Sequence, residues 1–535
     1  MTYDFLSALK RLEGNLKGKL AWRAWSPRRW ILLLVLTPLL SLAAYDALAH
    51  WLLSGPKLRA LINADPESLR LDYDEATSLW PGCLTIKNLR IRGSDQNVQW
   101  IIRLAAARVD YSVLALVKRT FRVERLRGTG LSFYLRNTLG PAESKAGDAS
   151  VLPAVPGFAD PPLRSAEIQV AAPNGDPWRI DVRTLFIDHF DDIWIDAFHY
   201  RGAARLEGGF FLRPGLLARI GPARVDFESG ETRIGHAPAG ISVSGTVSGA
   251  FQPFEPPRVQ GSEVWRQVSG EVKLDARFER LQSLEYLVRS AAGTRLEDGI
   301  GKGSIRAAIE RGIAKGEVRV AIQDGSVRLN KLKLRGAADW RMLIPRWNLT
   351  SGPLEVSGSR LTLSDVRSSG SDESRRWWGR FDIPTGKIGS TTSAGIEANS
   401  RDARPLLALL AVDLPAWTRG LLNLDDFTAT ATVDIGPSLT RVRSLDARGG
   451  GFHIQGHYLR KKANREGAFL IESGALSVGL RLEHDAMNIR LLGAKRWFDD
   501  QPDGGRAARN TTPPSDAAAI PRPAPPTAVL SRTGL

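Results

Sequence analysis

Alternation of apolar and polar residues recurs through most of this chain and restricts its fold more than any other feature. In "FTATATVDI" (427–435), every second side chain is apolar, and these side chains are Phe427, Ala429, Ala431, Val433 and Ile435. Threonines and an aspartate occupy the positions between them. The same period of two recurs at 316–322, 326–336, 360–366, 475–483 and 487–492. Because successive side chains of a strand point to opposite faces, the pattern predicts many half-buried antiparallel strands.

Helical spacing is sparse in comparison. It occurs at 278–291 and at 404–422, and each of these segments follows an Asp-Ala-Arg and precedes alternating strands. This order predicts an internal repeat of one helix followed by a meander of strands. A shorter segment, 112–119, is typical of a short helix or a turn. The sequence therefore predicts a mainly β protein with a few short helices.

One long apolar stretch lies near the N-terminus. It reads "RRWILLLVLTPLLSLAAYDALAHWLL" (28–53), and a spanning helix needs about 20 apolar residues. Aromatic and basic side chains stand at its two ends, where they would anchor a helix at the membrane surfaces. We expect residues 30–53 to form a transmembrane anchor with these anchoring side chains: Arg28, Arg29, Trp30, Tyr45 and Trp51.

The charges around this stretch predict its orientation. Seven Lys and Arg residues but only two acidic residues lie within 1–29, whereas 54–75 holds more acidic than basic residues. The excess of positive charge predicts a basic cytoplasmic segment at 1–29 and places the bulk of the chain on the far side of the membrane. A cleaved signal peptide stays open as the alternative, because "ALA" at 47–49 resembles a cleavage site. Both interpretations place the body outside the cytoplasm.

The remaining chain divides by composition. Residues 54–83 read as a mixed linker, so the first strand is expected at Leu84, and a change of phase after Ile86 predicts a bulge. Within the first β unit, 54–136, further strands follow up to Arg136. Residues 137–162 are rich in Pro and Gly and predict a long flexible loop. Strands then fill a β-rich part, 163–498, and the Pro- and Ala-rich tail at 499–535 is expected to be disordered.

Motifs of catalysis are missing from the sequence. No G-x-S-x-G is present, and "DGIGKGS" (298–304) has a glycine where a phosphate-binding loop requires Ser or Thr. A single cysteine, Cys83, allows neither an intrachain disulfide nor a zinc site built from thiolates. We therefore expect no enzyme activity, no catalytic residue and no cofactor.

Acidic and histidine residues gather in "IDHFDDIWIDAFHY" (187–200). Such residues are able to bind a metal ion. The favoured interpretation is instead a hairpin with Asp191 and Asp192 in its turn, so we expect no metal site.

The net charge of +16 limits the partners. Arginines are scattered along the chain rather than gathered in one basic stripe, which argues against a nucleic-acid partner. Attraction to anionic lipid headgroups is the interpretation that best fits scattered arginine in a membrane-anchored chain.

The order of these segments carries a resemblance. A basic segment and one membrane span precede "CLTIKNLRIRG" (83–93) and "ARVDYSVLALVKRTFRVERLRGTGLSFYLR" (107–136). This run, together with "GALSVGLRLEHDAMNIRLLGAKRWF" (474–498), resembles the AsmA-like family of bacterial envelope proteins, which includes TamB-like relatives and is similar to eukaryotic bridge-like lipid-transfer proteins. The resemblance covers about 30–498 by pattern, and the family has no catalytic signature to match.

The resemblance implies a single N-terminal transmembrane helix followed by a long, curved, groove-like antiparallel β-sheet of repeated units. It also implies an anchor in the bacterial inner membrane, with the N-terminus in the cytoplasm and the bulk in the periplasm. The implied role is phospholipid transport or outer-membrane lipid homeostasis, with acyl chains as partners and further envelope proteins as candidates. The alternative is an anchored scaffold or assembly factor with closed β-sandwich domains. On the first interpretation, the apolar face at 427–435 lines the groove.

Overall fold

The computed structural model of the protein is mainly β. It describes the following residues: 27–54, 69–94, 98–137, 155–158, 178–213, 216–235, 240–255, 258–259, 261–285, 294–329, 332–368, 376–401, 426–436, 438–461, 464–484 and 486–501. These fall into two compact units. Unit 1 consists of Met1–Leu287, Ile300–Glu317 and Arg346–Gly352, and unit 2 consists of Val288–Gly299, Val318–Pro345 and Pro353–Leu535.

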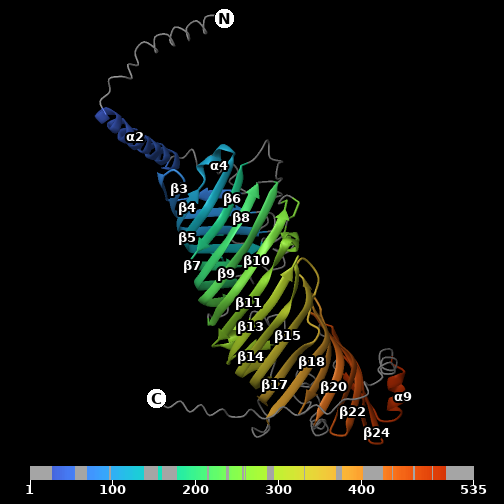
Figure 1. The fold of residues 1–535 in the computed structure, drawn as a ribbon. Helices are drawn as coiled ribbons and strands as arrows, with labels where there is room; N and C mark the ends of the chain where they lie inside the picture. The colour runs from blue at the N-terminus through green and yellow to red at the C-terminus, as the bar shows by residue number, and fades with distance from the viewer. Residues whose placement is uncertain are drawn as a thin grey trace, which may run out of the picture. The chain divides into compact units, whose positions relative to one another are not determined.

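Unit 1 begins with a long apolar helix and continues with strands (Figure 1). Its elements are α2 (Pro27–Ser54), β1 (Leu69–Asp72), β2 (Glu75–Trp80), β3 (Cys83–Ser94), β4 (Val98–Tyr111), α4 (Val113–Val117), β5 (Thr120–Asn137), β6 (Arg179–Ile187), β7 (Phe190–Ile195), β8 (Phe198–Arg213), β9 (Leu217–Ile234), β10 (Ile241–Phe254), η2 (Gly261–Gln267), β11 (Val268–Phe278), η3 (Leu281–Leu284) and β13 (Ile300–Glu310).

The strands of unit 1 pair in an order that follows the chain closely. β1 and β2 both pair with β3, and β4 and β5 follow in turn. β6 and β7 then lie end to end along β5, after which β8, β9, β10, β11 and β13 continue the sheet. All of these pairs are antiparallel except β5–β6 and β5–β7, which are parallel. The expectation of antiparallel strands therefore holds with one parallel seam in unit 1.

Two predictions about the start of the sheet have different outcomes. The linker predicted at 54–83 is wrong in its second half, because β1 and β2 lie within it and pair with β3 before the strand expected at Leu84. Pro81 and Gly82 mark the turn between β2 and β3. The change of phase after Ile86 is confirmed, because Asn88 has a φ of 52° and the buried face continues at Leu89. The bulge predicted there is wrong, because β3 keeps one register with β4 on both sides of Asn88.

The helical predictions are confirmed only for the shortest segment. α4 occupies the segment expected to be a short helix or turn. The helix expected at 278–291 is wrong in its first part, because β11 ends at Phe278 and the short 3-10 helix η3 follows at Leu281–Leu284. Residues 286–291 lie outside the described residues. Pairing of β11 with β10 and β13 holds Phe278 in the sheet and overrides the helical spacing. The expected helix at 404–422 and the tail from 502 onward lie outside the described residues.

The remaining elements belong mainly to unit 2 (Figure 1). They are β12 (Thr294–Leu296), β14 (Ile313–Leu329), β15 (Leu332–Asn348), β16 (Leu354–Glu355), β17 (Ser359–Ser368), β18 (Trp377–Ile388), β19 (Thr392–Ser400), β20 (Phe427–Gly436), β21 (Leu439–Gly449), β22 (Phe452–Lys461), β23 (Asn464–Ser473), β24 (Leu476–Glu483), β25 (Ala486–Arg490) and α9 (Ala494–Asp499). A run of antiparallel neighbours leads from β15 through β17 and each later strand to β25.

Helix α9 covers one face of unit 2 near its end. Ala494 and Phe498 of the helix pack against Ala468 and Leu470 of β23, and all four side chains are buried. Gly479 of β24 lets the helix approach, because a Cβ at this position would stand 2.7 Å from the ring of Trp497. The last strands are thus covered on the face that presents Leu470.

Leu470 provides a test of this packing. Leu470→Ala is expected to lower the free energy of unfolding of unit 2 by about 2–5 kcal/mol, because it leaves a cavity beneath α9. Leu492→Ala is the matched control, since that side chain is 87% exposed and its loss should change the free energy by less than about 0.5 kcal/mol. Urea denaturation of both variants would measure the difference. Equal effects would contradict the packing described for α9.

An ion cluster in unit 2 predicts a dependence on pH. Hydrogen bonds from Lys333 and Arg328 lower the pKa of Glu297 from 4.5 to about 2. Because the folded pKa lies below the unfolded value, this stabilisation is fully present above pH 4.5 and disappears as the pH falls toward about 2. Glu297→Gln is therefore expected to be less stable than the parent at pH 7 and equal to it near pH 2 in thermal unfolding. A constant difference across this range would contradict the assignment.

Candidate functional site

An uninterrupted row of apolar side chains crosses nine neighbouring strands of unit 2. Strand register places one residue from each strand directly opposite the next, and the row consists of Trp340, Leu361, Phe381, Ala398, Ala429, Ala447, Ile454, Ile471 and Val478. Ala447 is buried and Trp340 is exposed, while the other seven side chains are half-buried. The row is therefore a continuous apolar stripe that the protein covers only in part.

The adjacent row of unit 2 belongs to the other face and is mainly polar. Its residues, in the same strand order, are Arg341, Arg360, Asp382, Glu397, Thr430, Asp446, Gln455, Leu470 and Gly479. Asp382 accepts hydrogen bonds from Arg380 at 2.9 Å and from Arg360. Leu470 and Gly479 interrupt the polarity, at the point where α9 covers this face. One face of the sheet thus suits water and the other suits hydrocarbon.

Unit 1 repeats the arrangement in its later strands. From β8 to β13, one half-buried apolar row consists of Leu206, Val225, Val247, Val272 and Ala307. The adjacent row of the other face consists of Arg205, Asp226, Thr246, Lys273 and Arg306. The side chains of this row form hydrogen bonds with one another and with neighbours on the same face. For example, Thr246 of the row and the neighbouring Arg224 both donate hydrogen bonds to Asp226. Hydrogen bonds from Arg224 and Thr246 lower the pKa of Asp226, so this face stays charged.

The apolar face predicted at 427–435 lies on β20. Phe427, at one end of the strand, is buried against Ala447, and Ile435, at the other end, is 49% exposed. Ala429, Ala431 and Val433 are half-buried between them. Pairing with β19 runs without a shift from Phe427 to Ile435, so the five side chains share one face. The sequence located this face correctly, and its role as a groove lining stays a prediction.

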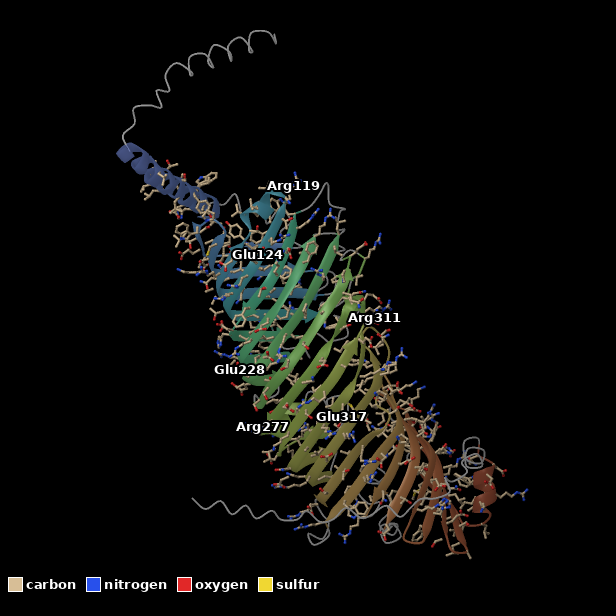
Figure 2. The ribbon with its side chains drawn as sticks, in the orientation of Figure 1. Arg119, Glu124, Glu228, Arg277, Arg311 and Glu317 are labelled. Carbon is tan, nitrogen blue, oxygen red and sulfur yellow. The ribbon has the colours of Figure 1, made fainter. Side chains whose placement is uncertain are left out.

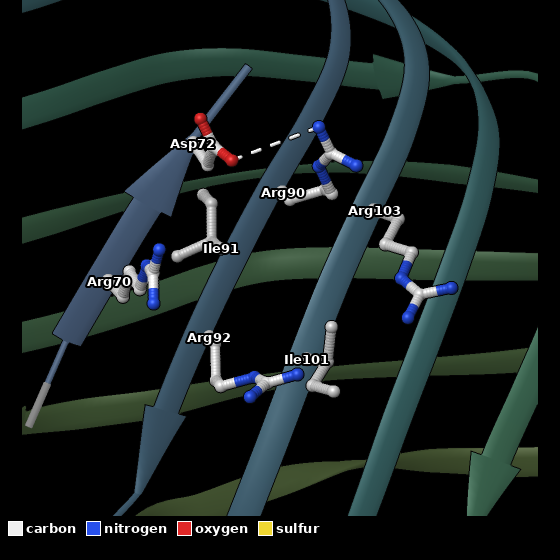
Figure 3. Close-up of a pocket in the computed structure, with 7 residues that line it drawn as sticks. All are labelled: Arg70, Asp72, Arg90, Ile91, Arg92, Ile101 and Arg103. Carbon is white, nitrogen blue, oxygen red and sulfur yellow. Dashed lines mark ion pairs between the residues drawn. The ribbon is translucent and has the colours of Figure 1, made fainter. Parts of the chain in front are cut away.

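The first strands of unit 1 behave differently, because they pack a true core. Leu89, Leu104 and Leu131 of β3, β4 and β5 are buried together with Tyr200 and Ala204 of β8. Figure 3 shows the blue strands of the N-terminal part crossing in front of the green strands behind them. Burial, followed by the charge of Glu228, raises the pKa of Tyr200 to about 12. Here the sheet covers its own apolar face.

The predicted anchor forms a helix that is joined to this core. α2 contains one stretch, Leu34–Trp51, long and apolar enough to cross a membrane, and none of that stretch is buried. Trp51 is exposed, as expected of an anchor, but Tyr45 donates or accepts a 2.6 Å hydrogen bond with Ser78 of β2. Tyr45 therefore fastens the helix to the sheet. The side chains of Arg28, Arg29 and Trp30 lie outside the described residues.

A second hydrogen bond fixes the end of the same helix. The hydroxyl of Tyr73, which is buried in the core, donates to the carbonyl oxygen of Leu53 at 2.6 Å. Together with the bond of Tyr45, it holds the last third of α2 against β2 and the start of the sheet.

The acidic and histidine residues at 187–200 adopt an arrangement that the sequence did not predict. Asp191 and Asp192 lie within β7, and the turn falls at Asp196, so the predicted position of the turn is wrong. Pairing of β7 with both β5 and β8 requires an extended backbone at 190–195. Asp192 binds His199 and accepts a 3.0 Å hydrogen bond from Trp194 Nε1. Within the described residues, no group of three His, Cys, Asp or Glu side chains could hold a metal ion.

Part of the predicted loop at 137–162 packs on the outer side of β4, β5 and β7, which is the side opposite the core around Tyr200. Val155 is buried with Ile101, Tyr134 and Trp194. Arg136 stacks over the ring of Phe158 at 4.8 Å. The rest of this loop lies outside the described residues.

A basic pocket of about 300 Å³ opens on this outer side (Figure 3). Its lining residues are Arg70, Asp72, Arg90, Ile91, Arg92, Ile101 and Arg103. Arg90 pairs with Asp72 and with Asp74, and Arg92 donates to the carbonyl oxygen of Gly157 at 3.1 Å. The register sets Arg70 directly opposite Arg92, and Arg90 directly opposite Arg103. Such a pocket attracts phosphate or carboxylate groups, because arginine binds both in a bidentate manner.

Sequence reasoning missed the basic pocket and a group of exposed apolar side chains near α4. The pocket left a signal in the alternating arginines of "LRIR" (89–92), which place two guanidinium groups on one face. The apolar group left a signal in "LW" (79–80) and "VLALV" (113–117). Only strand pairing shows that these short segments are neighbours.

Comparison with known proteins identified no relative: no family model, no curated protein and no solved structure matches this chain.

The opposed arginines of the pocket predict an unusual effect on stability. Like charges directly opposite one another destabilise a sheet, so Arg70→Gln is expected to raise the melting temperature at low ionic strength. The gain should vanish near 1 M salt, where the Debye length is about 3 Å. Arg90→Gln is the matched control and should not raise it, because it breaks ion pairs with Asp72 and Asp74. A lower melting temperature for Arg70→Gln would contradict the repulsion.

Proposed function

We propose that this protein is a membrane-anchored lipid-handling protein of the AsmA-like class. In this proposal, α2 crosses the bacterial inner membrane once, with the N-terminus in the cytoplasm and both units in the periplasm. The apolar faces of the sheets curve around the acyl chains of phospholipids and form a groove for them. The protein thereby takes part in phospholipid transport or in outer-membrane lipid homeostasis.

The apolar row of unit 2 is the observation that carries this proposal. Soluble proteins rarely leave a contiguous apolar surface of this extent uncovered. Nine strands spaced about 4.8 Å apart give a row on the order of 40 Å long. An acyl chain spans about half of the roughly 30 Å hydrocarbon core of a bilayer, or about 15 Å. The row is therefore long enough to cover more than one acyl chain along its length.

The polar face of each unit complements this arrangement. Paired charges such as Asp382 with Arg380 favour hydration of the outer side, so that lipid is directed to one face only. Movement of lipid along an apolar face forms and breaks no covalent bond. The proposal therefore assigns the protein no catalytic residue and no cofactor.

One observation favours a second candidate function. The first strands of unit 1 bury their apolar residues in a packed core around Tyr200 and Ala204, which leaves little room for acyl chains there. An anchored scaffold or assembly factor needs only such closed cores. The two candidates differ in what they predict for the half-buried faces.

A charge on the apolar face of β20 tests the lipid proposal. Ala431→Arg is expected to reduce the phospholipid that co-purifies with the full-length protein by about tenfold or more, because burying an unpaired charge against hydrocarbon costs several kcal/mol. Thr430→Arg is the matched control on the same strand. Its side chain lies on the polar face opposite Glu397 and Asp446, and lipid should stay bound. Mass spectrometry of the extracted lipids measures both.

The outcome separates the two candidate functions. For a scaffold, neither parent nor variant carries phospholipid, and Ala431→Arg lowers the melting temperature as a core substitution does. For a lipid-handling protein, the parent carries phospholipid and Ala431→Arg loses it while circular dichroism of the sheet is kept. Equal lipid in Ala431→Arg and Thr430→Arg would overturn the assignment of this face.

A further inference from the structure

We infer that one end of unit 1 inserts into the membrane surface beside α2. The inserting surface, which we term the α4 patch, consists of Leu79, Trp80, Val113, Leu114 and Val117. The inference rests on the membrane anchoring contained in the proposed function, but it does not depend on whether the sheets carry lipid.

Exposure of large apolar side chains distinguishes this end of the unit. Val117 is 84% exposed, Leu114 82%, Leu79 71% and Trp80 63%. Of the five residues of α4, only Ala115 is buried. The two most exposed aliphatic side chains of this helix therefore do not pack into the core of the protein. Contiguous exposed apolar groups of this kind mark a surface that contacts a membrane or a partner.

Strand pairing brings the two parts of the patch together. Trp80 pairs with Cys83 across the β2–β3 turn, and the carbonyl oxygen of Gly82 in that turn accepts a 2.7 Å hydrogen bond from the backbone of Tyr111. α4 begins two residues after Tyr111. A Cβ at Gly82 would stand 3.9 Å from Val113, so the turn and the helix touch.

Helix α2 reaches the sheet at the same place. The Tyr45 hydroxyl bonds Ser78 at 2.6 Å and donates to the carbonyl oxygen of Trp80 at 3.4 Å. Burial, followed by a hydrogen bond with Tyr45, raises the pKa of Tyr111, in keeping with the proximity of these two side chains. The α4 patch is therefore continuous with the one described helix that could cross a membrane.

The length of α2 sets the depth of the patch. From Trp30, where the expected span begins, to Tyr45 the helix rises about 22 Å at 1.5 Å per residue, which is less than the roughly 30 Å of a bilayer's hydrocarbon core. Tyr45, and Trp80 beside it, are therefore within reach of the far membrane surface. An indole at this level is typical of the membrane–water interface.

Basic residues lie next to the patch, where headgroups would be. Lys118 and Arg119 directly follow α4, and the carbonyl oxygen of Arg119 accepts a 3.0 Å hydrogen bond from the backbone of Arg179. Figure 2 labels Arg119 at this end of unit 1, with Glu228 and Arg277 at the opposite end. Apolar side chains bordered by cations favour an anionic bilayer as the occupant over a second protein.

A fluorescent probe at Leu114 tests the inference in the full-length protein. Leu114→Cys in a Cys83→Ser background gives a single cysteine for an environment-sensitive label, since Cys83 is the only native cysteine. The labelled protein is reconstituted into vesicles of phosphatidylethanolamine and phosphatidylglycerol. Leu492→Cys in the same background is the matched control, because Leu492 is as exposed as Leu114 but lies in unit 2.

We expect the label at position 114 to emit at shorter wavelength than the label at 492 and to be quenched by lipids that carry a nitroxide on the acyl chain. Iodide in the water should quench it less than the label at 492. Absence of quenching by the nitroxide lipids would overturn the inference. Strong quenching by iodide would then show that the label is in water, and weak quenching by iodide would show that another protein covers it.

Flotation and a second variant separate this inference from the proposed function. Flotation with the vesicles after alkaline washing reports anchoring by α2 alone. If the protein no longer floats, both the anchoring by α2 and the membrane contact of the α4 patch are overturned. Val117→Glu in the labelled protein should reduce lipid quenching at position 114 while flotation stays complete. Unchanged quenching in this variant would overturn the role of α4. Lipid carried on β20 is measured independently and has no bearing on this result.

Discussion

Registered pairing between neighbouring strands is the constraint on which the rest of this structure depends. Because each strand alternates its side chains, a register held over many strands collects every second residue on one face. In unit 2 this rule aligns Trp340 with Val478 through seven strands between them. A slip of one residue in β20 would place Thr430 in the apolar row and Ala431 opposite Asp446. The apolar stripe is therefore a property of the pairing and not of any single strand.

The apolar face of the sheet is buried in one part of unit 1 and only half-buried in another. Where β3, β4 and β5 lie against β8, residues such as Leu104 and Tyr200 are buried by the sheet itself. From β8 to β13, the row through Val247 and Val272 is only half-buried. The difference arises from the number of layers, because a single layer of sheet cannot cover both of its faces. Lipid, in the proposal above, supplies the missing layer.

Attachment of α2 joins the apolar helix to the sheet more directly than a flexible tether would. Two phenolic hydroxyls, of Tyr45 and Tyr73, bond the last third of the helix to β2 and to the core. In the inference above, the same contact brings the α4 patch to the membrane surface. An anchor joined in this way restricts the orientation of unit 1, whereas an unstructured linker would leave it free.

The sequence by itself determined that this chain is mainly β, which face of β20 is apolar, and that α2 is long enough to span a membrane, because periodicity and length are local properties of the chain. It also located the phase change at Asn88. Only the tertiary structure placed β1 and β2 in the supposed linker, held Phe278 in a strand and moved the turn from Asp191 to Asp196, because partner strands decide these positions. The arginine pocket and the α4 patch likewise depend on neighbours that are distant in sequence. Alternation specifies which side chains share a face, and pairing alone decides what that face meets.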